Sequence, residues 1–502
     1  MIDNYILSPV FIHLFTAILQ LIAWRKTVTQ RFMSVIGSLF GVILAIRLLS
    51  NVDEHGILTM NASNWEAPFG IVFVADLLSS SLVLITSIAG LAVSLFSSTG
   101  LNRQRMNYGY FPIFHFLVMG LNGAFLTGDI FNLYVWFEVI IISSFVLMTL
   151  GGRKTQLEGA VKYMAMNILA STFFLTGIGI LYGITGTLNM ADLAIKIKQV
   201  DNQYLVGITS CFFLIGFGIK SAVFPLYYWL PSSYHTPPSA VAATFGGLLT
   251  KVGIYAMIRV FSLIFIPDSV TRDLLMVVAV LTIITGAMGA LIKWNIRRLF
   301  SYLIVCHIGF MIGGIGMFTK VALMGTLFYL FHDILVKTNM FLIAGVIRQL
   351  RGTMDMKSLG GLYAEYPKIS LLIAIVLFSL VGIPPLSGFW PKIYLFQAAF
   401  EQSQYFYIAA LVLGSFVTLF VIARAWSEIF WKNVPKGVII ENNFEAMPLI
   451  RKILLVLPIG LLAVVTLYVG LNAETIVQLV DKISDQLIDT RPYVEAVLGK
   501  QN

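Results

Sequence analysis

Long runs of apolar residues alternate with short polar loops from one end of the chain to the other. Most runs reach about 20 residues, the length that an α-helix needs to cross the hydrocarbon core of a bilayer. The pattern therefore predicts an all-α integral membrane protein with about fourteen transmembrane helices. We expect them near residues 5–23, 33–50, 70–98, 110–127, 130–150, 161–185, 204–224, 239–266, 273–292, 299–317, 321–346, 370–398, 405–431 and 452–472. After Ala473 the chain mixes apolar and acidic residues, which predicts an amphipathic helix at the surface.

Prolines interrupt two of these helices, the seventh and the twelfth. Pro225 ends the apolar run of the seventh helix, which continues as a short piece toward Leu230, and Pro384 and Pro385 lie within the twelfth. A proline inside a helix frees a backbone carbonyl, which within a membrane must face protein or a polar cavity. Because broken helices beside buried charges form the ion sites of many transporters, both breaks are candidate parts of an ion path.

A faint internal repeat divides the chain. Helices 4–8 and 9–13 each form a block of five, and in each block the fourth helix is broken and carries a lysine, Lys220 or Lys392. The stretches FNLYVWFEVII and FSYLIVCHIGF also align, which places Glu138 against His307. An odd number of spans gives two copies of opposite orientation, the inverted repeat of many transporters, although chance similarity between apolar segments competes with this interpretation. The predicted units are 1–109, the two repeats 110–266 and 267–432, and 433–502 with the last helix and the tail.

Composition supports a membrane protein and excludes several other classes. Apolar residues make up 58% of the 502 residues and charged residues 11%, far below the roughly 25% of a soluble domain. The net charge of +9 comes mostly from Lys and Arg in short loops, so it does not indicate a nucleic-acid partner. Cys211 and Cys306 form no CxxC pair and are expected to be buried, which gives no zinc or iron–sulfur site. With no phosphate loop, dinucleotide fingerprint or nucleophile elbow, we expect no cofactor and no enzyme activity of the chain's own.

The basic residues of the loops predict an orientation. The loop after the first helix carries Arg25, Lys26 and Arg31, whereas the next loop is acidic and has no Lys or Arg. Later basic loops fall on the same side as the first. Because positive loops face the cytoplasm, both termini are predicted on the outer side.

Two charged residues in the first repeat form the first candidate site. Glu138 lies midway along the fifth predicted helix without a cation within one turn, and Lys220 lies just before the break at Pro225. A charge at the centre of a bilayer costs about 2.5–3.5 kcal/mol, so such residues usually serve a function. A nearby Glu138 would hold the proton of Lys220, and its withdrawal would release that proton. The alternative is a permanent ion pair that only ties two helices together.

Lys251 and Lys392 are candidates because each lies in an apolar run without an acid beside it. Lys251 is embedded in GGLLTKVGIYAMI, too deep to reach the interface easily. Lys392 follows the second break in PPLSGFWPKIYLF, where it is placed as a terminal proton donor or acceptor toward the outer side.

Helices 10 and 11 supply the centre of the expected path. His307 can take and return a proton near neutral pH, although a buried structural histidine is an equal alternative. In FHDILVKTNMF, Asp333 and Lys337 are spaced i,i+4 and can neutralise each other on one face, which leaves Lys337 either as a relay group or as half of a local pair. His332 is adjacent but points elsewhere, and it is the weakest candidate of the group.

Four further sites have simpler explanations. Asp76 and Asp129 lie near helix ends, where a carboxylate can cap free backbone N–H groups. Glu158 and Lys162 form a surface i,i+4 pair, and Arg259 is expected to anchor a helix end.

These motifs resemble a known family. The stretch DIFNLYVWFE with Glu138, Lys220 with the following FP break, GGLLTKVGIYA with Lys251 and GIPPLSGFWPK with Lys392 are similar to the proton-antiporter-like membrane proteins. This group includes membrane subunits of respiratory complex I and the large subunits of the Mrp (Mnh) Na⁺/H⁺ antiporter. The resemblance covers about residues 70–430.

The resemblance implies a fold with fourteen helices and two inverted repeats of five helices. It also implies a proton path through Glu138 and Lys220, then Lys251, His307 and Lys337, and finally Lys392. The Mrp members act in hetero-oligomers with other Mrp subunits in the bacterial plasma membrane, exchange sodium for protons and support growth in alkali and salt. The expected partners are therefore those subunits, the lipid bilayer, protons and, as a further candidate, Na⁺.

Three functions remain open at this point. The first is a proton-translocating subunit of a secondary cation/proton antiporter. The second is a proton-pumping module of a redox enzyme of the complex I type or a related hydrogenase. The third is a scaffold without conduction, in which the buried charges only lock helices together; small residues could pack these helices at lower cost.

Overall fold

Apolar helices make up most of the structure, a computed structural model that describes residues 5–437 and 441–499. Within these ranges, eleven helices are long and apolar enough to cross a membrane by length and composition. They are α2 (Thr27–His55), α3 (Leu77–Gly100), α6 (Ile130–Thr149), α7 (Lys154–Thr185), α9 (Gln203–Ser221), the continuous helix Ser239–Leu263, α13 (Ser269–Ile292), α14 (Ile296–Met317), α15 (Lys320–Arg351), the continuous helix Tyr405–Trp431, and α20 (Leu449–Leu471). Three shorter apolar helices are α1 (Ser8–Ile22), α5 (Tyr110–Leu126) and α17 (Pro367–Val381).

Short elements connect these helices. The helix Ser239–Leu263 comprises α11 (Ser239–Thr244), the π-helical turn η4 (Phe245–Leu249) and α12 (Thr250–Leu263), and Tyr405–Trp431 comprises α19 (Tyr405–Trp426) and the π-helical η6 (Ser427–Trp431). The remaining helices are α4 (Arg103–Asn107), α8 (Met190–Lys196), α10 (Trp229–Ser233), α16 (Leu362–Glu365), α18 (Phe389–Glu401), α21 (Ala473–Ile488) and α22 (Arg491–Leu498), with 3₁₀ turns η2 (Ala62–Asn64), η3 (Ile197–Gln199) and η5 (Met356–Ser358).

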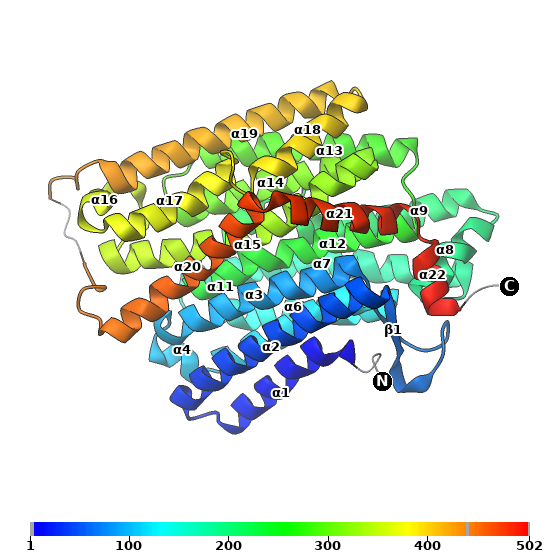
Figure 1. Ribbon diagram of the computed structural model, residues 1–502, viewed down its shortest axis with the longest axis horizontal. Helices are drawn as coiled ribbons and strands as arrows, with labels where there is room; N and C mark the ends of the chain where they lie inside the picture. Colours follow the sequence, from blue (N-terminus) through cyan, green and yellow to red (C-terminus); the bar gives the residue numbers. More distant parts are fainter. Residues whose placement is uncertain (1–4, 438–440, 500–502) are drawn as a thin grey trace.

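The helices run side by side as one bundle, with α1 along one edge and α19 along the opposite edge (Figure 1). The central helix is α15, whose most apolar stretch is entirely buried. It packs against α3, α14, α18 and α20. Asp333 and Lys337 in the middle of α15 are therefore shielded from lipid by other helices.

The predicted third helix begins later than expected. Residues 72–75, which the apolar pattern assigns to that helix, form strand β2 (Val72–Ala75), paired antiparallel with β1 (Leu58–Asn61). The helix starts at Leu77 because the Asp76 side chain caps it, accepting a hydrogen bond from the Ser79 backbone N–H. The run Val72-Phe73-Val74 favours a strand through its β-branched and aromatic side chains.

Both predicted helix breaks are present. α9 ends at Ser221 and α10 begins at Trp229, while α17 ends at Val381 and α18 begins at Phe389. After each first half the backbone turns into the left-handed region, at Ala222 (φ 60°) and at Gly382 (φ 86°). A left-handed residue ends a helix, so the prolines that follow lie outside it and remove no intrahelical bond.

A third irregularity, which the proline pattern does not predict, lies in η4. A Cβ atom at Gly247 would stand 1.9 Å from Thr338 Oγ1 on α15 and 3.2 Å from the Ile334 carbonyl oxygen. Only glycine permits this close approach. The π-helical turn therefore brings the start of α12, and Lys251 with it, against the middle of α15.

Matching contacts recur at the two ends of the bundle. Asp129 caps α6 and forms a bridge with Asn189, while Asn295 caps α14 and forms a bridge with Asp355. The first bridge joins the starts of α6 and α8, and the second joins the starts of α14 and η5. α8 lies toward the end of the bundle that holds β1, opposite the end that holds α16 (Figure 1). Glu138 lies nine residues after the Asp129 cap, and Ile304 lies nine residues after the Asn295 cap. Ile304 is therefore the position in α14 that matches Glu138, and His307 lies about one helical turn further along.

The tail after Ala473 forms the predicted amphipathic helix, α21, followed by α22. Its buried positions recur on one face: Ala473, Val480, Ile483, Ser484 and Leu487. On its charged side, Asp481 and Asp485 each lie 2.9 Å from Lys320 Nζ at the start of α15. The tail is thus fastened to the central helix.

Candidate functional site

Asp333 is the centre of a fully buried group of charged residues. Its Oδ2 lies 2.9 Å from Lys251 Nζ, and its Oδ1 lies 3.6 Å from His307 Nδ1 and 4.0 Å from Lys337 Nζ. All four side chains have zero exposed area. They come from α12, α14 and α15, so three helices meet at one carboxylate.

The local pair that the i,i+4 spacing allows is present, but it is not the shortest contact of Asp333. Lys337 Nζ lies 4.0 Å from Asp333 Oδ1, whereas Lys251 reaches Asp333 Oδ2 from another helix at 2.9 Å. Lys337 Nζ has no hydrogen-bond partner within residues 5–437 and 441–499. Lys251 also donates a hydrogen bond to the Gly246 carbonyl oxygen in η4 (2.6 Å), so the irregular turn holds this lysine in place.

His307 has a defined hydrogen-bond pattern on its other side. Thr418 Oγ1 donates to the Gly414 carbonyl (2.7 Å), and it lies 3.2 Å from His307 Nε2. Because the threonine proton is already used, its oxygen accepts from Nε2–H. The remaining nitrogen, Nδ1, is then the one that faces Asp333 and can receive a proton.

The second helix break holds Lys392 and His332. Lys392 Nζ reaches back across the break and donates to the Val381 carbonyl at the end of α17 (2.7 Å). His332 Nδ1 lies 2.8 Å from Ser387 Oγ, which in turn lies 2.8 Å from Ser379 Oγ. As expected, His332 points away from Asp333, toward the break.

Aromatic rings lie between the break and the Asp333 group. The Phe310 ring is 5.3 Å from the His307 ring, and Lys392 Nζ lies 5.7 Å from its centre. Tyr329 contacts both histidine rings, at 5.7 Å from His307 and 5.6 Å from His332. These rings separate the Asp333 group from the second helix break.

Glu138 and Lys220 do not form the direct ion pair that the sequence suggests. No ion pair of either residue occurs in the part of the chain that the structure describes. Lys220 Nζ lies 4.7 Å from the centre of the ring of Phe137, the neighbour of Glu138. Glu138 Oε1 is buried without a hydrogen-bond partner among the described residues.

A small cavity of about 20 Å³ lies beside Lys220. Its lining includes Lys220, Tyr163, Asn167, Trp229 and Tyr234. A cavity of at least about 10–15 Å³ with two to four polar partners can hold a water molecule. Lys220 also lies in the last turn of α9, where the negative end of the helix dipole favours a cation.

Two of the lesser candidates have the structural roles that the sequence predicts. Asp129 caps α6 through the Asn132 N–H (2.7 Å), and Glu158 pairs with Lys162 at the surface (2.6 Å), as predicted. Cys306 is buried, whereas Cys211 is exposed, contrary to expectation.

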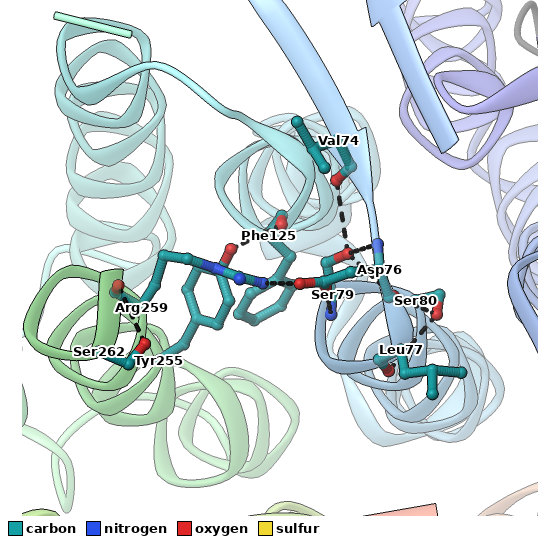
Figure 2. A network of polar contacts seen from close by, with 9 residues as sticks. All are labelled: Val74, Asp76, Leu77, Ser79, Ser80, Phe125, Tyr255, Arg259 and Ser262. Atoms are coloured by element: carbon teal, nitrogen blue, oxygen red, sulfur yellow. Dashed lines mark hydrogen bonds and ion pairs between the residues drawn. The ribbon is translucent and has the colours of Figure 1, made fainter. Parts of the chain in front are cut away.

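Arg259 is more than an anchor at a helix end. It is buried in an ion pair with Asp76, while Tyr255 beside it donates to the Phe125 carbonyl (2.7 Å) (Figure 2). The Tyr493 ring of α22 lies 5.2 Å from its guanidinium carbon. This network joins α3, α5, α12 and the tail.

The sequence pattern does not single out Asp333 as a candidate site residue. A carboxylate within a long apolar helix is a signal, but Lys337 four residues later offers a local explanation for it. The described residues contain no group of three or more His, Cys, Asp or Glu side chains that could hold a metal ion.

Comparisons with known proteins show the family of this chain. Residues 127–418 match the family described as NADH:quinone oxidoreductase/Mrp antiporter, TM. An MnhD-type Na(+)/H(+) antiporter subunit of Alkalihalophilus pseudofirmus is 39% identical over 497 residues, 99% of each chain. This chain belongs to the MnhD family of Na⁺/H⁺ antiporter subunits.

Solved structures show the same fold. A chain of the Mrp complex from Dietzia sp. DQ12-45-1b superposes with a TM-score of 0.88 and 28% identity, covering 99% of both chains. A chain of the membrane-bound sulfane sulfur reductase, an archaeal respiratory membrane complex, gives a TM-score of 0.87 and 25% identity over 99% of this chain and 100% of that one. The MnhD family consists of multi-pass membrane subunits of transport complexes, so this member is a transporter subunit and not an enzyme.

Proposed function

We propose that this chain is the proton-translocating subunit of a multisubunit Na⁺(cation)/H⁺ antiporter, assembled with other Mrp subunits in the plasma membrane. It supports sodium extrusion and cytoplasmic pH homeostasis. The observation that carries the proposal is the single Asp333 carboxylate facing Lys251, His307 and Lys337 without exposed area. One negative charge cannot balance three positive ones in a low-dielectric site, so a proton arriving at one group favours its loss from another.

The proposed path runs from Glu138 and Lys220 to Lys251, then through His307 and Lys337 to Lys392. His332 is a weaker member, because its contacts are with the serines of the second break. The cavity beside Lys220 supplies room for a water molecule on the first part of the path. We assign protons to this path and not Na⁺, because its lysines and histidine repel a metal cation.

The broader architecture in this proposal has fourteen membrane crossings with both termini outside. The proposed units are 1–109, the inverted repeats 110–266 and 267–432, and 433–502. The matching bridges of Asp129 and Asn295 at opposite ends of the bundle support such a repeat.

Antiport in inverted membrane vesicles tests the proposal. Lys220→Ala, Glu138→Ala and Lys337→Ala, each made in the whole operon, should abolish Na⁺-dependent proton movement while the complex assembles normally. Lys162→Ala is the matched control, because Lys162 is an exposed lysine on α7. Full antiport in the three variants would sink the proposal, and lost assembly would favour the scaffold function instead.

The likeness to a respiratory complex favours one alternative, a proton pump driven by redox chemistry elsewhere in its complex. The same residues would then carry protons. Vesicles energised by an imposed pH gradient, without an electron donor, separate the two. Na⁺ exchange under these conditions supports the antiporter, and its absence together with donor-driven pumping supports the redox complex.

A further inference from the structure

Four arginines line a hollow beside α4. This short helix lies at one end of the bundle (Figure 1). The volume of the hollow is about 380 Å³, within the range of sites that hold small ligands. We call it the arginine cavity. Its charged lining residues are Arg105, Arg153, Arg297, Arg348 and Glu441, and its amide lining residues are Asn102, Gln349 and Asn443. It lies outside the proposed proton path.

The arginine cavity has an excess of positive charge. Among the described residues, Glu441 is the only carboxylate in its lining, against four guanidinium groups. None of the four arginines forms an ion pair within residues 5–437 and 441–499. By contrast, nearby Arg351 has its own acid, with a bidentate contact to Glu365 at 2.8 and 2.9 Å. The four arginines of the cavity therefore have no paired carboxylate of the kind that Glu365 provides to Arg351.

Several observations show that the arginines are held together in spite of their repulsion. Arg297 is 5% exposed, and it donates to the Pro237 carbonyl (2.6 Å) and to Ser239 Oγ, while its Nε has no partner among the described residues. Arg105 donates to the Leu150 carbonyl (3.2 Å). The pKa of Arg105, which lies outside the spanning helices, is lowered by burial and then by the like charges of Arg153 and Arg348. Neutral carbonyls orient these groups but cannot balance their charge.

We propose that the arginine cavity binds a phosphate group, that of an anionic phospholipid headgroup or of a soluble phosphate. Guanidinium forks match phosphate oxygens in bidentate geometry, and several forks around one hollow can share them. Basic pockets between spanning helices recognise phospholipid headgroups in this way. Phe96 and Leu101 in the same lining offer apolar contact to the glycerol and upper acyl part of a lipid.

The test uses the whole purified complex, stripped of lipid and returned to nanodiscs. The probes are phosphatidylglycerol in a phosphatidylcholine background and, separately, inorganic phosphate, with bound lipid measured by native mass spectrometry. Arg105→Gln with Arg348→Gln should lower phosphatidylglycerol retention at least tenfold. Arg103→Gln, an exposed arginine in the same α4 that is not in the lining, should leave it unchanged.

Each outcome bears on the proposal. Competition by millimolar inorganic phosphate would identify a soluble phosphate as the ligand, and retention against it would identify the lipid. Equal retention by wild type, double variant and control overturns the proposal, as does a carboxylate of a neighbouring subunit found inside the cavity. If the double variant does not assemble, the single variant Arg348→Lys replaces it, because lysine keeps the positive charge but lacks the guanidinium group that binds phosphate in bidentate geometry. It should then weaken retention of phosphatidylglycerol, and unchanged retention overturns the proposal.

Discussion

Lys251 Nζ and Asp333 Oδ2 lie 2.9 Å apart, and neither side chain has exposed area. The two residues come from different helices, and Gly247 allows η4, just before Lys251, to approach α15 closely. The pair is thus a product of tertiary packing. Gain or loss of one proton at this pair would also change the electrostatic interactions of His307 and Lys337, which face the same carboxylate.

Asp333→Asn is predicted to destabilise the subunit and to stop transport. Removal of one partner from a buried ion pair leaves the other charge uncompensated and typically costs about 3–5 kcal/mol. Thermal unfolding of the purified complex measures the first effect, and antiport in vesicles measures the second. An Asp333→Asn complex with wild-type antiport would contradict the role assigned to this carboxylate.

The double variant Lys251→Met with Asp333→Leu separates stability from function. Replacement of a buried pair by apolar residues of similar size is often neutral in stability. We expect the double variant to unfold near the wild-type temperature and still to show no antiport. Recovery of antiport in the double variant would mean that the pair serves only to hold helices together.

Local sequence patterns predict the helices and their two breaks, because both depend on residues close along the chain. Strand β2 is misassigned from the sequence since its four apolar residues lead almost directly into the apolar run of α3. The start of α3 depends on one cap, Asp76, and the sequence identifies that residue only as one that can cap a helix end.

Charge pairing is predicted less well, because partners come from distant segments. Lys337 is the nearest cation to Asp333 along α15, yet Lys251 is nearer in space. Glu138 and Lys220 lie on helices that contact each other through aromatic rings, and Lys220 lies over the Phe137 ring without an ion pair to Glu138 among the described residues. Which of several partners a buried charge meets depends on packing that no local pattern contains.

Asn167→Leu is predicted to slow transport without affecting assembly. Asn167 lines the cavity beside Lys220, and a leucine there removes a polar partner and fills space that a water molecule can use. We expect at least a tenfold lower rate, equivalent to about 1.4 kcal/mol in the barrier. Initial rates of proton movement in vesicles check this, with Thr172→Leu on the exposed face of α7 as control. Equal slowing by both substitutions would remove the cavity from the path.

Arg259→Gln is predicted to lower stability but to leave the transport rate per assembled complex unchanged. Its pair with Asp76 joins α12 to α3 and lies outside the proposed path (Figure 2). Loss of one partner from this buried pair should cost about 3–5 kcal/mol, visible as a lower unfolding temperature. A large loss of transport at normal assembly would instead place Arg259 on the path.

Two substitutions at Asp76 test whether the pair or the cap matters more. Asparagine is as good an N-cap as aspartate, so Asp76→Asn removes the charge and keeps the cap of α3. Asp76→Ala removes both and should cost about 1 kcal/mol more. The difference in unfolding temperature between the two variants measures the cap alone, and equal values would show that the cap contributes nothing.

Stability is predicted to fall as the pH drops from about 6.5 toward 4, and His235 is responsible for part of this fall. His235 lies outside the spanning helices, and its Nε2 accepts a hydrogen bond from Arg298 (3.1 Å). Burial first, and the charge of Arg298 second, lower its pKa from 6.5 to about 4. Between these two pKa values His235 binds a proton in the unfolded chain but not in the folded chain. The free energy of unfolding therefore falls as the pH falls. Unfolding temperatures of the complex between pH 4 and 7.5 should drop by a few °C less in His235→Gln than in wild type. Parallel curves for the two proteins would show that another group is responsible.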